Sequence, residues 1–284
     1  MFSFNLRNFI NDTLMTNTAI NDFKKIIWNY YAANGRFFDW RNVDDPYKVF
    51  ISEVMLQQTQ TYRVAPKYAQ WMSVFPDFKT LANASLKEVL LQWQGLGYNR
   101  RGMYLHRAAQ EIVQKYNGNL PDDPNNLVEL PGIGKATAAS VCAFAFNKKT
   151  IFIETNIRAV YIHFFFAGKD KVHDNEIFPL VEATVDHENP REWYYALMDY
   201  GVMIKKTLVN PSRKSRHHQK QSKFEGSDRQ IRGMILKILT ATKDAISVQK
   251  LTDMIGKDHV RIQKIIDQMI EEKFICKIDE GLSI

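Results

Sequence analysis

Apolar residues recur every three to four positions along most of the chain, which predicts a mostly helical protein. The apolar faces of the predicted helices fall at 47–58, 89–93, 105–113 and 138–146. Residues in the last stretch are small and apolar almost all round, which indicates a helix buried on every side. The turns at 122–124 and 188–190 contain proline and open further helices. No strand pattern precedes the C-terminus, so the predicted fold class is all-α.

The pattern changes near the C-terminus into a small unit that begins at Ser227. Its three apolar stripes lie at 231–239, 248–255 and 262–270. Residues 274–278 then alternate, and a turn leads into 282–284. Three helices and a hairpin predict a winged-helix-like domain. Such domains bind duplex DNA or pack against proteins, and the pattern alone leaves both roles open.

A basic segment precedes this domain. From Lys205 to Lys223 the chain carries seven Lys or Arg residues, two His residues and no acid. A charge run is ordinarily a solvated tether, but the absence of any acid favours contact with phosphates. The candidate phosphate-binding side chains are Arg213, Lys214 and Arg216. The domains predicted from these patterns are 1–204, a basic linker loop at 205–226, and 227–284.

Composition and charge narrow the function classes. With 284 residues, 45% of them hydrophobic, the chain is long enough for one large or two modest folded domains. A formal net charge of +7 and a pI near 9.2 favour a polyanionic partner. No secretory leader or membrane-spanning apolar run occurs. We therefore expect a soluble, intracellular monomer, located in the cytoplasm or nucleoid if the source is bacterial.

Cysteine and histidine usage argues against a bound metal. Cys142 and Cys276 are the only cysteines, and their apolar neighbours predict buried, inert thiols. Two cysteines provide neither a disulfide framework nor a cysteine metal site. The seven histidines show no metal-ligand spacing. The sequence therefore predicts no protein-bound metal.

A glycine-containing hairpin offers the clearest candidate binding site. Within Leu130–Ala138, Gly132 and Gly134 stand one residue apart, and a helical run follows. Two such glycines can form a tight hairpin with positive φ at little steric cost. Its amides and the first helical turn, which includes Lys135 and Thr137, then suit a phosphate group.

Two glutamates are candidates for acid–base chemistry. Glu53 has apolar neighbours near the start of a helix, and a carboxyl in an apolar pocket has a raised pKa. The alternative is an ordinary surface glutamate. Glu154 is either a second pocket carboxylate or a helix N-terminal acid, with or without an ion pair to Arg158. Two carboxylates in one pocket can divide the work of cleaving a glycosidic bond. Spacing leaves open whether these two share one.

A second glycine-rich turn lies at Gly95–Arg101 and contains an aromatic residue and two arginines. Together with Tyr98 of this turn, Gln57 and Gln58 are of the size and polarity that could fill a gap in a base stack. The alternatives are helix surface for the two glutamines and core packing for the tyrosine.

The ordered set of these motifs resembles the helix-hairpin-helix (HhH-GPD) DNA glycosylases, and the MutY-type adenine glycosylases most closely. The resemblance covers roughly Trp40 to Ile204. Its motifs are Trp40-Arg41, Pro46–Val49, Ser52–Gln60, Gly95–Tyr98, Leu105–Ala109, Leu130–Ala138 and Met198–Gly201. The string Ser52–Thr59 is highly specific for this branch.

The resemblance implies two helical lobes with a cleft between them, into which a nucleotide flips from the duplex. It places Glu53 at the catalytic glutamate, which protonates the base and then assists water. Asn156 falls on a residue that orients the catalytic groups, and Trp40 and Arg41 fall near the adenine pocket. The resemblance places at the duplex wedge or at base contacts the residues Leu56, Gln57, Gln58 and Tyr98.

The chain departs from the family pattern at Glu154, in its missing cysteines, and at its C-terminus, where the winged-helix-like unit replaces the domain by which many MutY-type enzymes recognise oxidised guanine. Glu154 stands where the family has a catalytic aspartate. Ala136 stands where bifunctional relatives carry a lysine nucleophile, so strand cleavage through a Schiff base is not expected. The four cluster-binding cysteines are missing, so no iron–sulfur cluster is expected. Some relatives bind a monovalent cation through hairpin carbonyls, which makes Leu130–Ala138 a candidate cation site.

These features together predict that the protein is a monofunctional DNA glycosylase of base excision repair and that its partner is double-stranded DNA. The expected substrate is adenine mispaired with guanine or 8-oxoguanine, because the ring nitrogen of a purine needs a proton before it leaves and Glu53 could supply it. One alternative keeps the fold and removes mismatched thymine or uracil. Another is a DNA-binding protein that does not cleave, for which the basic segment and the winged-helix-like domain would be suited.

Overall fold

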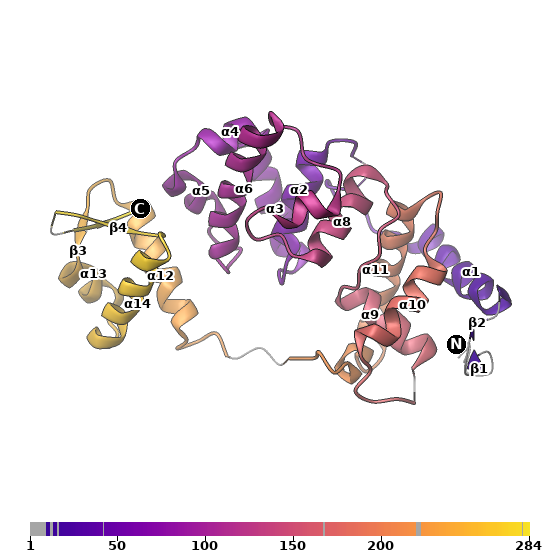
Figure 1. The fold of residues 1–284 in the computed structure, drawn as a ribbon. Coiled ribbons are helices and arrows are strands. Elements are labelled where there is room, and N and C mark those ends of the chain that lie inside the picture. Colours follow the sequence, from indigo (N-terminus) through magenta and orange to yellow (C-terminus); the bar gives the residue numbers. More distant parts are fainter. Residues whose placement is uncertain are drawn as a thin grey trace. The chain divides into compact units, whose positions relative to one another are not determined.

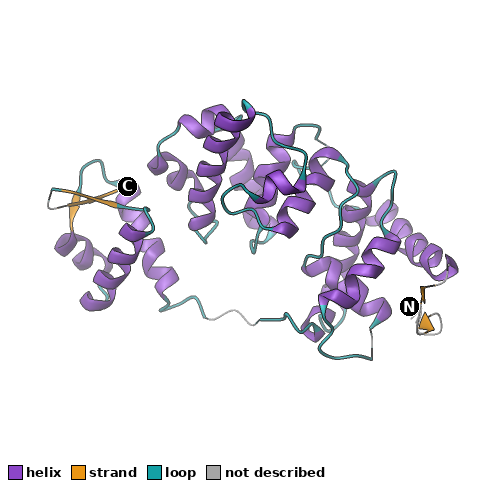
Figure 2. Cartoon of the chain, in the orientation of Figure 1, coloured by secondary structure: helices purple, strands orange, loops and turns teal. Residues whose placement is uncertain are grey.

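The structure is a computed structural model that describes residues 10–11, 14–15, 17–41, 43–166, 168–219, 223–279 and 281–284. Helices dominate the described residues, and the strands are short, which confirms the all-α prediction (Figures 1 and 2). The chain divides into two compact units. The first unit is drawn from Met1–Val49, Asp122–Val128 and Ile133–Lys220, and the second from Phe50–Pro121, Glu129–Gly132 and Gln221–Ile284.

Helix packing builds the first unit. Its elements are β1 (Ile10–Asn11), β2 (Leu14–Met15), α1 (Asn17–Asn34), α7 (Pro124–Val128), α8 (Lys135–Phe146), α9 (Thr155–Phe165), α10 (Asp174–Thr184), α11 (Pro190–Thr207) and the 3₁₀ helix η2 (Pro211–Lys214). α11 packs against α9, α1 and α8. The antiparallel pair β1–β2 contradicts the expectation that no strand precedes the C-terminus. Strands of two residues are too short to show an alternating pattern in the sequence.

Helix α8 forms part of the core of the first unit. Its residues from Ala138 to Ala145 are all buried, as predicted from their apolar character on every side. Phe144 stacks on Tyr195 of α11 with ring centroids 4.6 Å apart. Asn147 ends the helix in the left-handed conformation, with φ of 51°. The start of α8 is therefore held at the surface by a fixed core.

Helix α2 (Pro46–Leu56) is divided between the two units. Its residues up to Val49 belong to the first unit, and those from Phe50 onward belong to the second. The other elements of the second unit are α3 (Thr61–Val74), α4 (Phe78–Asn83), α5 (Leu86–Trp93), α6 (Arg100–Tyr116), α12 (Asp228–Ala241), β3 (Ile246–Ser247), α13 (Val248–Ile255), α14 (His259–Glu271), β4 (Cys276–Ile278) and β5 (Gly281–Ser283). A capping box between Ser85 and Glu88 begins α5. Trp71 and Trp93 meet edge to face in the core, with centroids 5.7 Å apart.

The C-terminal elements share a core with α5 and α6. The three helices occur where the sequence predicts them, and the strands form an antiparallel sheet in the order β3-β5-β4. Leu90 of α5 and Met103 of α6 belong to the same buried cluster as Leu236 and Leu239 of α12. Burying these side chains together fixes α12 against α5, since apolar burial contributes about 25 cal/mol per Å². The winged-helix-like assignment of 227–284 stays a prediction.

Residues 205–219 of the basic segment are more ordered than a loop or tether. α11 continues to Thr207, so the expected loop does not begin at residue 205. Val172 donates its backbone N–H to the carbonyl of Lys214, and Arg216 donates to the carbonyl of Val172, both at 2.9 Å. Ser215 is buried beneath this pairing. The tether prediction is therefore wrong for this part of the segment, whose backbone is fixed to the first unit.

Candidate functional site

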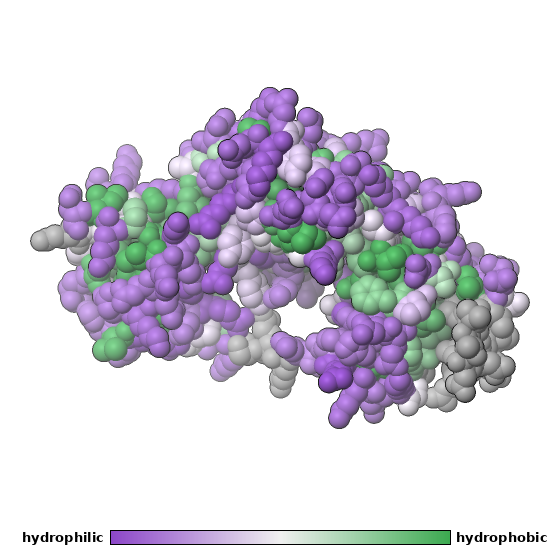
Figure 3. Space-filling model, in the orientation of Figure 1, coloured by the Kyte–Doolittle hydropathy of each residue, from purple (hydrophilic) through white to green (hydrophobic). Residues whose placement is uncertain are grey.

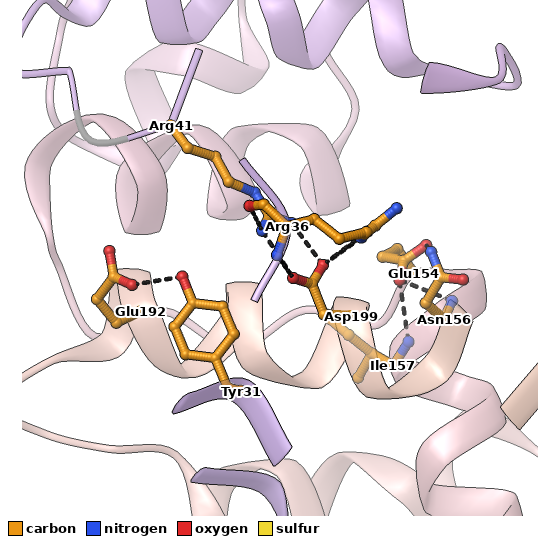
Figure 4. A network of polar contacts seen from close by, with 8 residues as sticks. All are labelled: Tyr31, Arg36, Arg41, Glu154, Asn156, Ile157, Glu192 and Asp199. Atoms are coloured by element: carbon orange, nitrogen blue, oxygen red, sulfur yellow. Dashed lines mark hydrogen bonds and ion pairs between the residues drawn. The ribbon is translucent and has the colours of Figure 1, made fainter. Parts of the chain in front are cut away.

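Glu154 caps the N-terminus of α9 in the first unit. Its Oε1 accepts hydrogen bonds from the backbone N–H of Asn156 at 2.6 Å and of Ile157 at 2.9 Å, and Asn156 Nδ2 donates to Oε2 at 3.2 Å (Figure 4). The expected ion pair with Arg158 is wrong, because Arg158 donates two hydrogen bonds of 2.7 Å to Asp174. A carboxylate at this position is favoured by the positive end of the helix.

A lysine lies within electrostatic range of this carboxylate. Burial raises the pKa of Glu154 above its ordinary value, and the amide donors and Lys205 reduce this increase. Burial lowers the pKa of Lys205, and Glu154 opposes that change. Arg36 also lowers the pKa of Lys205. Pairs of perturbed groups mark candidate functional sites. In the sequence, Lys205 stands out only as the start of the basic segment.

Asn156 is placed by close packing between α9 and α11. A Cβ added at Gly201 would lie 2.4 Å from the carbonyl oxygen of Asn156, so only glycine allows this approach. Asn156 Oδ1 is buried, and no hydrogen-bond donor for it occurs among the described residues. An unpaired buried acceptor is costly, and a water or a ligand N–H would satisfy it.

An ion-pair network lies in the interior of the first unit. Arg41 donates to Asp199 Oδ2 at 2.9 Å and to Oδ1 at 2.8 Å, and the backbone N–H of Arg36 donates to Oδ2 at 2.7 Å (Figure 4). Burial alone would raise the pKa of Asp199, but the hydrogen bonds and charges of Arg41 and Arg36 outweigh it and lower that pKa. The Arg41 guanidinium also lies over the ring of Tyr195, 4.4 Å from its centroid.

The structure thus places Trp40 and Arg41 in a packed interior. Trp40 is buried and stacks on Phe38 with ring centroids 4.7 Å apart and an interplanar angle of 5°. The Arg41 guanidinium is bound by Asp199. Their role at an adenine pocket stays a prediction, and no pattern in the sequence assigns Asp199 a role of its own.

Glu53 lies on α2 in the second unit. It is half-buried, and the flanking Ser52 and Val54 are buried. The apolar pocket expected for its carboxyl group, with a raised pKa, stays a prediction. Glu154 belongs to the first unit, so the sharing of one pocket by these two carboxylates stays a prediction.

Arg101 joins the end of α2 to the second glycine-rich turn. Its guanidinium donates to the carbonyls of Val54 at 2.8 Å and Met55 at 3.0 Å, and to Thr59 Oγ1 at 2.9 Å. A cation is favourable at the carbonyl end of a helix. Burial lowers the pKa of Arg101 to about 10. The two-arginine motif in the turn was visible in the sequence, but the partners of Arg101 were not.

A cleft in the second unit, with a volume of about 1280 Å³, brings several predicted residues together. We call it the cationic cleft. Its lining residues are Gln57, Gln58, Arg63, Lys67, Leu90, Gln94, Gly95, Leu96, Gly97, Tyr98, Asn99, Arg100, Arg101, Tyr104, Gly132, Phe224, Arg229, Arg232, Gly233, Leu236, Lys237 and Phe274. Gln57, Gln58 and Tyr98 therefore line the same cleft, and their base-contacting roles stay predictions. Leu56, the last residue of α2, is half-buried and is not among the lining residues.

Two of these residues adopt a backbone conformation that usually favours glycine. The φ angles of Gln58 and Tyr98 are 54° and 48°. Each left-handed residue costs about 1–2 kcal/mol in an L-amino acid chain. Tyr98 is 37% exposed, so the alternative of a core tyrosine is wrong. Side chains kept at a backbone cost and in contact with solvent favour a role in binding.

The hairpin at 130–138 contains two different glycines. Gly132 has φ of 79°, and a Cβ there would lie 2.8 Å from Tyr104 Cβ. Gly134 has φ of −87° and caps α8, and a Cβ there would meet nothing within 4 Å. Positive φ is therefore confirmed for Gly132 and wrong for Gly134. Lys135 is exposed and Thr137 is half-buried in the first turn of α8.

Comparison with known proteins identifies the family. Residues 51–180 match the profile of the HhH-GPD superfamily base excision DNA repair proteins. The chain is 34% identical to an adenine DNA glycosylase of Buchnera aphidicola over 64% of its own length and 52% of that protein. It is 30% identical to an adenine DNA glycosylase of Mycobacterium tuberculosis over 88% of its own length and 90% of that protein. The chain belongs to the adenine DNA glycosylase family of the HhH-GPD superfamily.

A solved structure of the superfamily has the same architecture. The structure of a thermostable thymine-DNA glycosylase superposes with a TM-score of 0.59 at 25% identity, covering 70% of this chain and 92% of that one. The chain spans 52% and 61% of the lengths of two Buchnera adenine DNA glycosylases that it matches.

The iron–sulfur cluster that the resemblance implies for this family does not fit the residues of this chain. Cluster ligation takes four thiolates, whereas the chain has two cysteines. Cys142 is buried in α8, and Cys276 on β4 is exposed, which contradicts the expectation that both are buried. Among the described residues, no three His, Cys, Asp or Glu side chains are grouped so as to hold a metal ion.

Two of the three candidate phosphate-binding side chains of the basic segment are exposed to solvent. Arg213 and Arg216 are exposed and Lys214 is half-buried, on a backbone fixed by Val172. None of the helices in the described ranges is both long and apolar enough to cross a bilayer. A fixed backbone with exposed guanidinium groups is consistent with the predicted phosphate contacts.

Substitution of the two hairpin glycines of this HhH-GPD protein is expected to have different effects on stability and on DNA binding. Gly132→Ala should lower the free energy of unfolding by about 1–3 kcal/mol, because the side chain is strained at positive φ and contacts Tyr104. Gly134→Ala should change the free energy of unfolding by less than about 0.5 kcal/mol, because its Cβ stands in open space. The same Cβ lies at the start of α8, where a phosphate is expected, so the substitution should weaken duplex binding. Urea unfolding and DNA titration measure both effects. Equal losses of stability would contradict this interpretation.

Proposed function

We propose that this protein is a monofunctional DNA glycosylase that removes adenine mispaired with guanine or 8-oxoguanine. The observation that carries the proposal is the string Ser52–Thr59, which holds Glu53 on α2 and ends beside the cationic cleft. The similarity to adenine DNA glycosylases over nearly the whole chain supports the same substrate. A glutamate suits this reaction, since adenine leaves only after its ring nitrogen is protonated.

In the proposed reaction, Glu53 donates a proton to a ring nitrogen of the flipped adenine. The bond between C1′ and the base then breaks, and its electron pair leaves with the adenine. Glu154, held by the amides of α9, stabilises the positive sugar. Water adds to C1′ and gives its proton to the Glu53 carboxylate, which leaves an abasic site and restores the acid. Asn156 keeps the Glu154 carboxylate oriented through its Nδ2.

Backbone phosphates are proposed to bind at two places in the first unit. Lys135 and Thr137 lie in the first turn of α8, where free amides favour an anion. Arg213 and Arg216 extend from the fixed basic segment, with Lys214 between them. Duplex DNA is thus the proposed partner, and the protein is proposed to act as a monomer without an iron–sulfur cluster. The hairpin remains a candidate for a monovalent cation.

A second candidate is the removal of mismatched thymine or uracil. The observation that favours it is the likeness to the thermostable thymine-DNA glycosylase, at 25% identity. Glu154 also stands where the family has a catalytic aspartate, and its extra methylene, which moves the carboxylate by about an ångström, leaves room for a different base. The same fold and the same DNA grip would serve both reactions.

A panel of duplexes separates these candidates. Each duplex carries A·G, A·8-oxoguanine, T·G, U·G or a matched pair, and alkali converts abasic sites into strand breaks after incubation. We expect breaks only in the two adenine mispairs, and none before alkali, because Ala136 offers no amine for a Schiff base. Breaks only in T·G and U·G would establish the second candidate. Bound duplex with no breaks in any mispair would overturn both.

A further inference from the structure

The cationic cleft carries an unusual balance of charge. Seven of its lining residues are Lys or Arg, and none is Asp or Glu. Four of the cations come from the helices around the second glycine-rich turn, namely Arg63, Lys67, Arg100 and Arg101. Three come from α12 in the C-terminal part, namely Arg229, Arg232 and Lys237. Such a concentration of one sign in a concave surface attracts anions.

The cations along α12 extend over more than one phosphate group. Arg229 and Lys237 are eight positions apart, which corresponds to about 12 Å along a helix. Lys237 is exposed, and Arg229 donates to the hydroxyl of Tyr98 at 3.2 Å. An anion that contacts both ends of this row is a chain of phosphates rather than a single ion. A nucleic-acid backbone has this form.

Part of the charge in the cleft is balanced by one acid. Glu272 accepts from Arg232 and forms an ion pair of 2.6 Å with Arg100. Arg100 and Arg232 therefore form ion pairs within the wall of the cleft. Arg101 donates hydrogen bonds to carbonyl groups at the end of α2. The other cations of the cleft are Arg63, Lys67, Arg229 and Lys237.

Aromatic side chains accompany the cations. Phe224 is 57% exposed and lines the cleft together with Tyr98 and Tyr104. Arg229 lies over the Tyr98 ring, 5.9 Å from its centroid. Cations interleaved with exposed aromatic rings are typical of surfaces that bind nucleic acids.

The cleft is a fixed part of the second unit. Leu90 and Met103 are buried with Leu236 of α12, and Gln94 Nε2 donates to Thr240 Oγ1 at 2.6 Å. These contacts fix α12, and with it the cationic row, beside the turn that carries Tyr98. Figure 3 shows both hydrophilic and hydrophobic side chains on the visible face of the C-terminal elements, and Lys237 of α12 is exposed.

We propose that the cationic cleft binds the phosphate backbone of DNA, so that the C-terminal part is a component of the DNA-binding surface. This proposal rests on the proposed function and extends it, because it assigns a role to residues beyond the region that resembles the family. It also chooses between the two roles that the sequence leaves open for residues 227–284. The side chains assigned to phosphate contact are Arg229 and Lys237.

The test compares charge changes inside and outside the cleft. Lys237→Glu and Arg229→Ala change the cleft. Lys250→Glu makes the same charge reversal at an exposed residue of α13 that does not line the cleft. Affinity for an intact, matched duplex is measured by fluorescence anisotropy at several salt concentrations in the full chain. The slope of log affinity against log salt changes by about 0.9 for each phosphate that the protein no longer neutralises.

We expect Lys237→Glu and Arg229→Ala each to flatten this slope by about 0.9 and to weaken binding on the order of tenfold at 0.1 M salt. Lys250→Glu should leave the slope unchanged. Equal slopes for all variants and the unmodified chain would overturn the proposal and leave the C-terminal part as a protein-packing surface. Thermal unfolding confirms that the variants fold, and the exposed Lys237 keeps the test valid if Arg229→Ala unfolds.

The mispair panel keeps this proposal separate from the proposed function. The unmodified chain could remove no base from any mispair while Lys237→Glu still weakens duplex binding. This result would refute the glycosylase activity and support phosphate binding in the cationic cleft. The unmodified chain could instead remove adenine while neither cleft substitution changes duplex binding. This result would refute phosphate binding in the cationic cleft and support the glycosylase activity.

Discussion

Glu53→Gln is expected to reduce base excision by about 10²–10⁴-fold, the usual contribution of a general acid. The amide has nearly the same size as the carboxyl, so α2 and its buried neighbours Ser52 and Val54 should keep their packing. It lacks the acidic proton that the adenine ring nitrogen requires. Single-turnover rates with an adenine mispair measure the chemical step directly, and anisotropy measures the affinity, which should change little.

The matched control is Glu111→Gln on α6. Glu111 forms an i,i+4 pair with Lys115, and the same amide substitution there should leave the excision rate unchanged. A Glu53→Gln rate within threefold of the unmodified rate would remove Glu53 from the acid role. The mispair panel would then need to be repeated with Glu154→Gln, because Glu154 is the other carboxyl with a candidate role.

The helices that could be predicted are those whose own sequence determines them. Residues 138–145 are apolar on every side, so any folded arrangement has to bury them, and α8 does. The stripes at 231–239 and 262–270 also correspond to α12 and α14, because an amphipathic face needs only a partner of apolar character. Local pattern was sufficient at these places.

Contacts between distant residues could not be predicted in the same way. Asp199 lies 158 positions from Arg41, and in the sequence both stand out only as parts of motifs. Lys205 and Glu154 are 51 positions apart and act on each other only once α11 packs against α9. Val172 pairs with the basic segment through backbone groups. Every residue has these groups, so the residue types do not reveal the pairing. Such pairings depend on the tertiary fold.

The candidate site shows the same division. The positions of Gln57, Gln58 and Tyr98 were predicted from motifs, and the structure places them in one cleft. The opposite wall of that cleft comes from α12, about 130 residues further along the chain, and no motif connects the two. Gly134 shows the reverse case, since its sequence context suggested positive φ although its backbone is ordinary. Motif spacing thus did not determine the backbone conformation of Gly134.

The second large effect is expected at Asp199. Asp199→Asn should lower the free energy of unfolding by about 3–5 kcal/mol, because it leaves Arg41 buried without its counter-charge. Asp199 and Arg41 have side chains that are 1% and 3% exposed, so water cannot replace the missing partner. Urea unfolding measures the loss. Asp174→Asn is the matched control, and its smaller loss follows from the larger exposure of the Arg158–Asp174 pair, at 16% and 21%.

The pH dependence of this difference tests its electrostatic origin. The arginines lower the pKa of Asp199 in the folded state, so its contribution is present above the ordinary aspartate pKa, about 3.9, and is lost as pH falls through the lower folded value. The unmodified chain should therefore exceed Asp199→Asn in stability by a constant amount near neutrality. The two stabilities should converge only below about pH 4. A difference that stayed constant down to the acid unfolding of the chain would indicate poorer packing, and the ion pair would then not be its source.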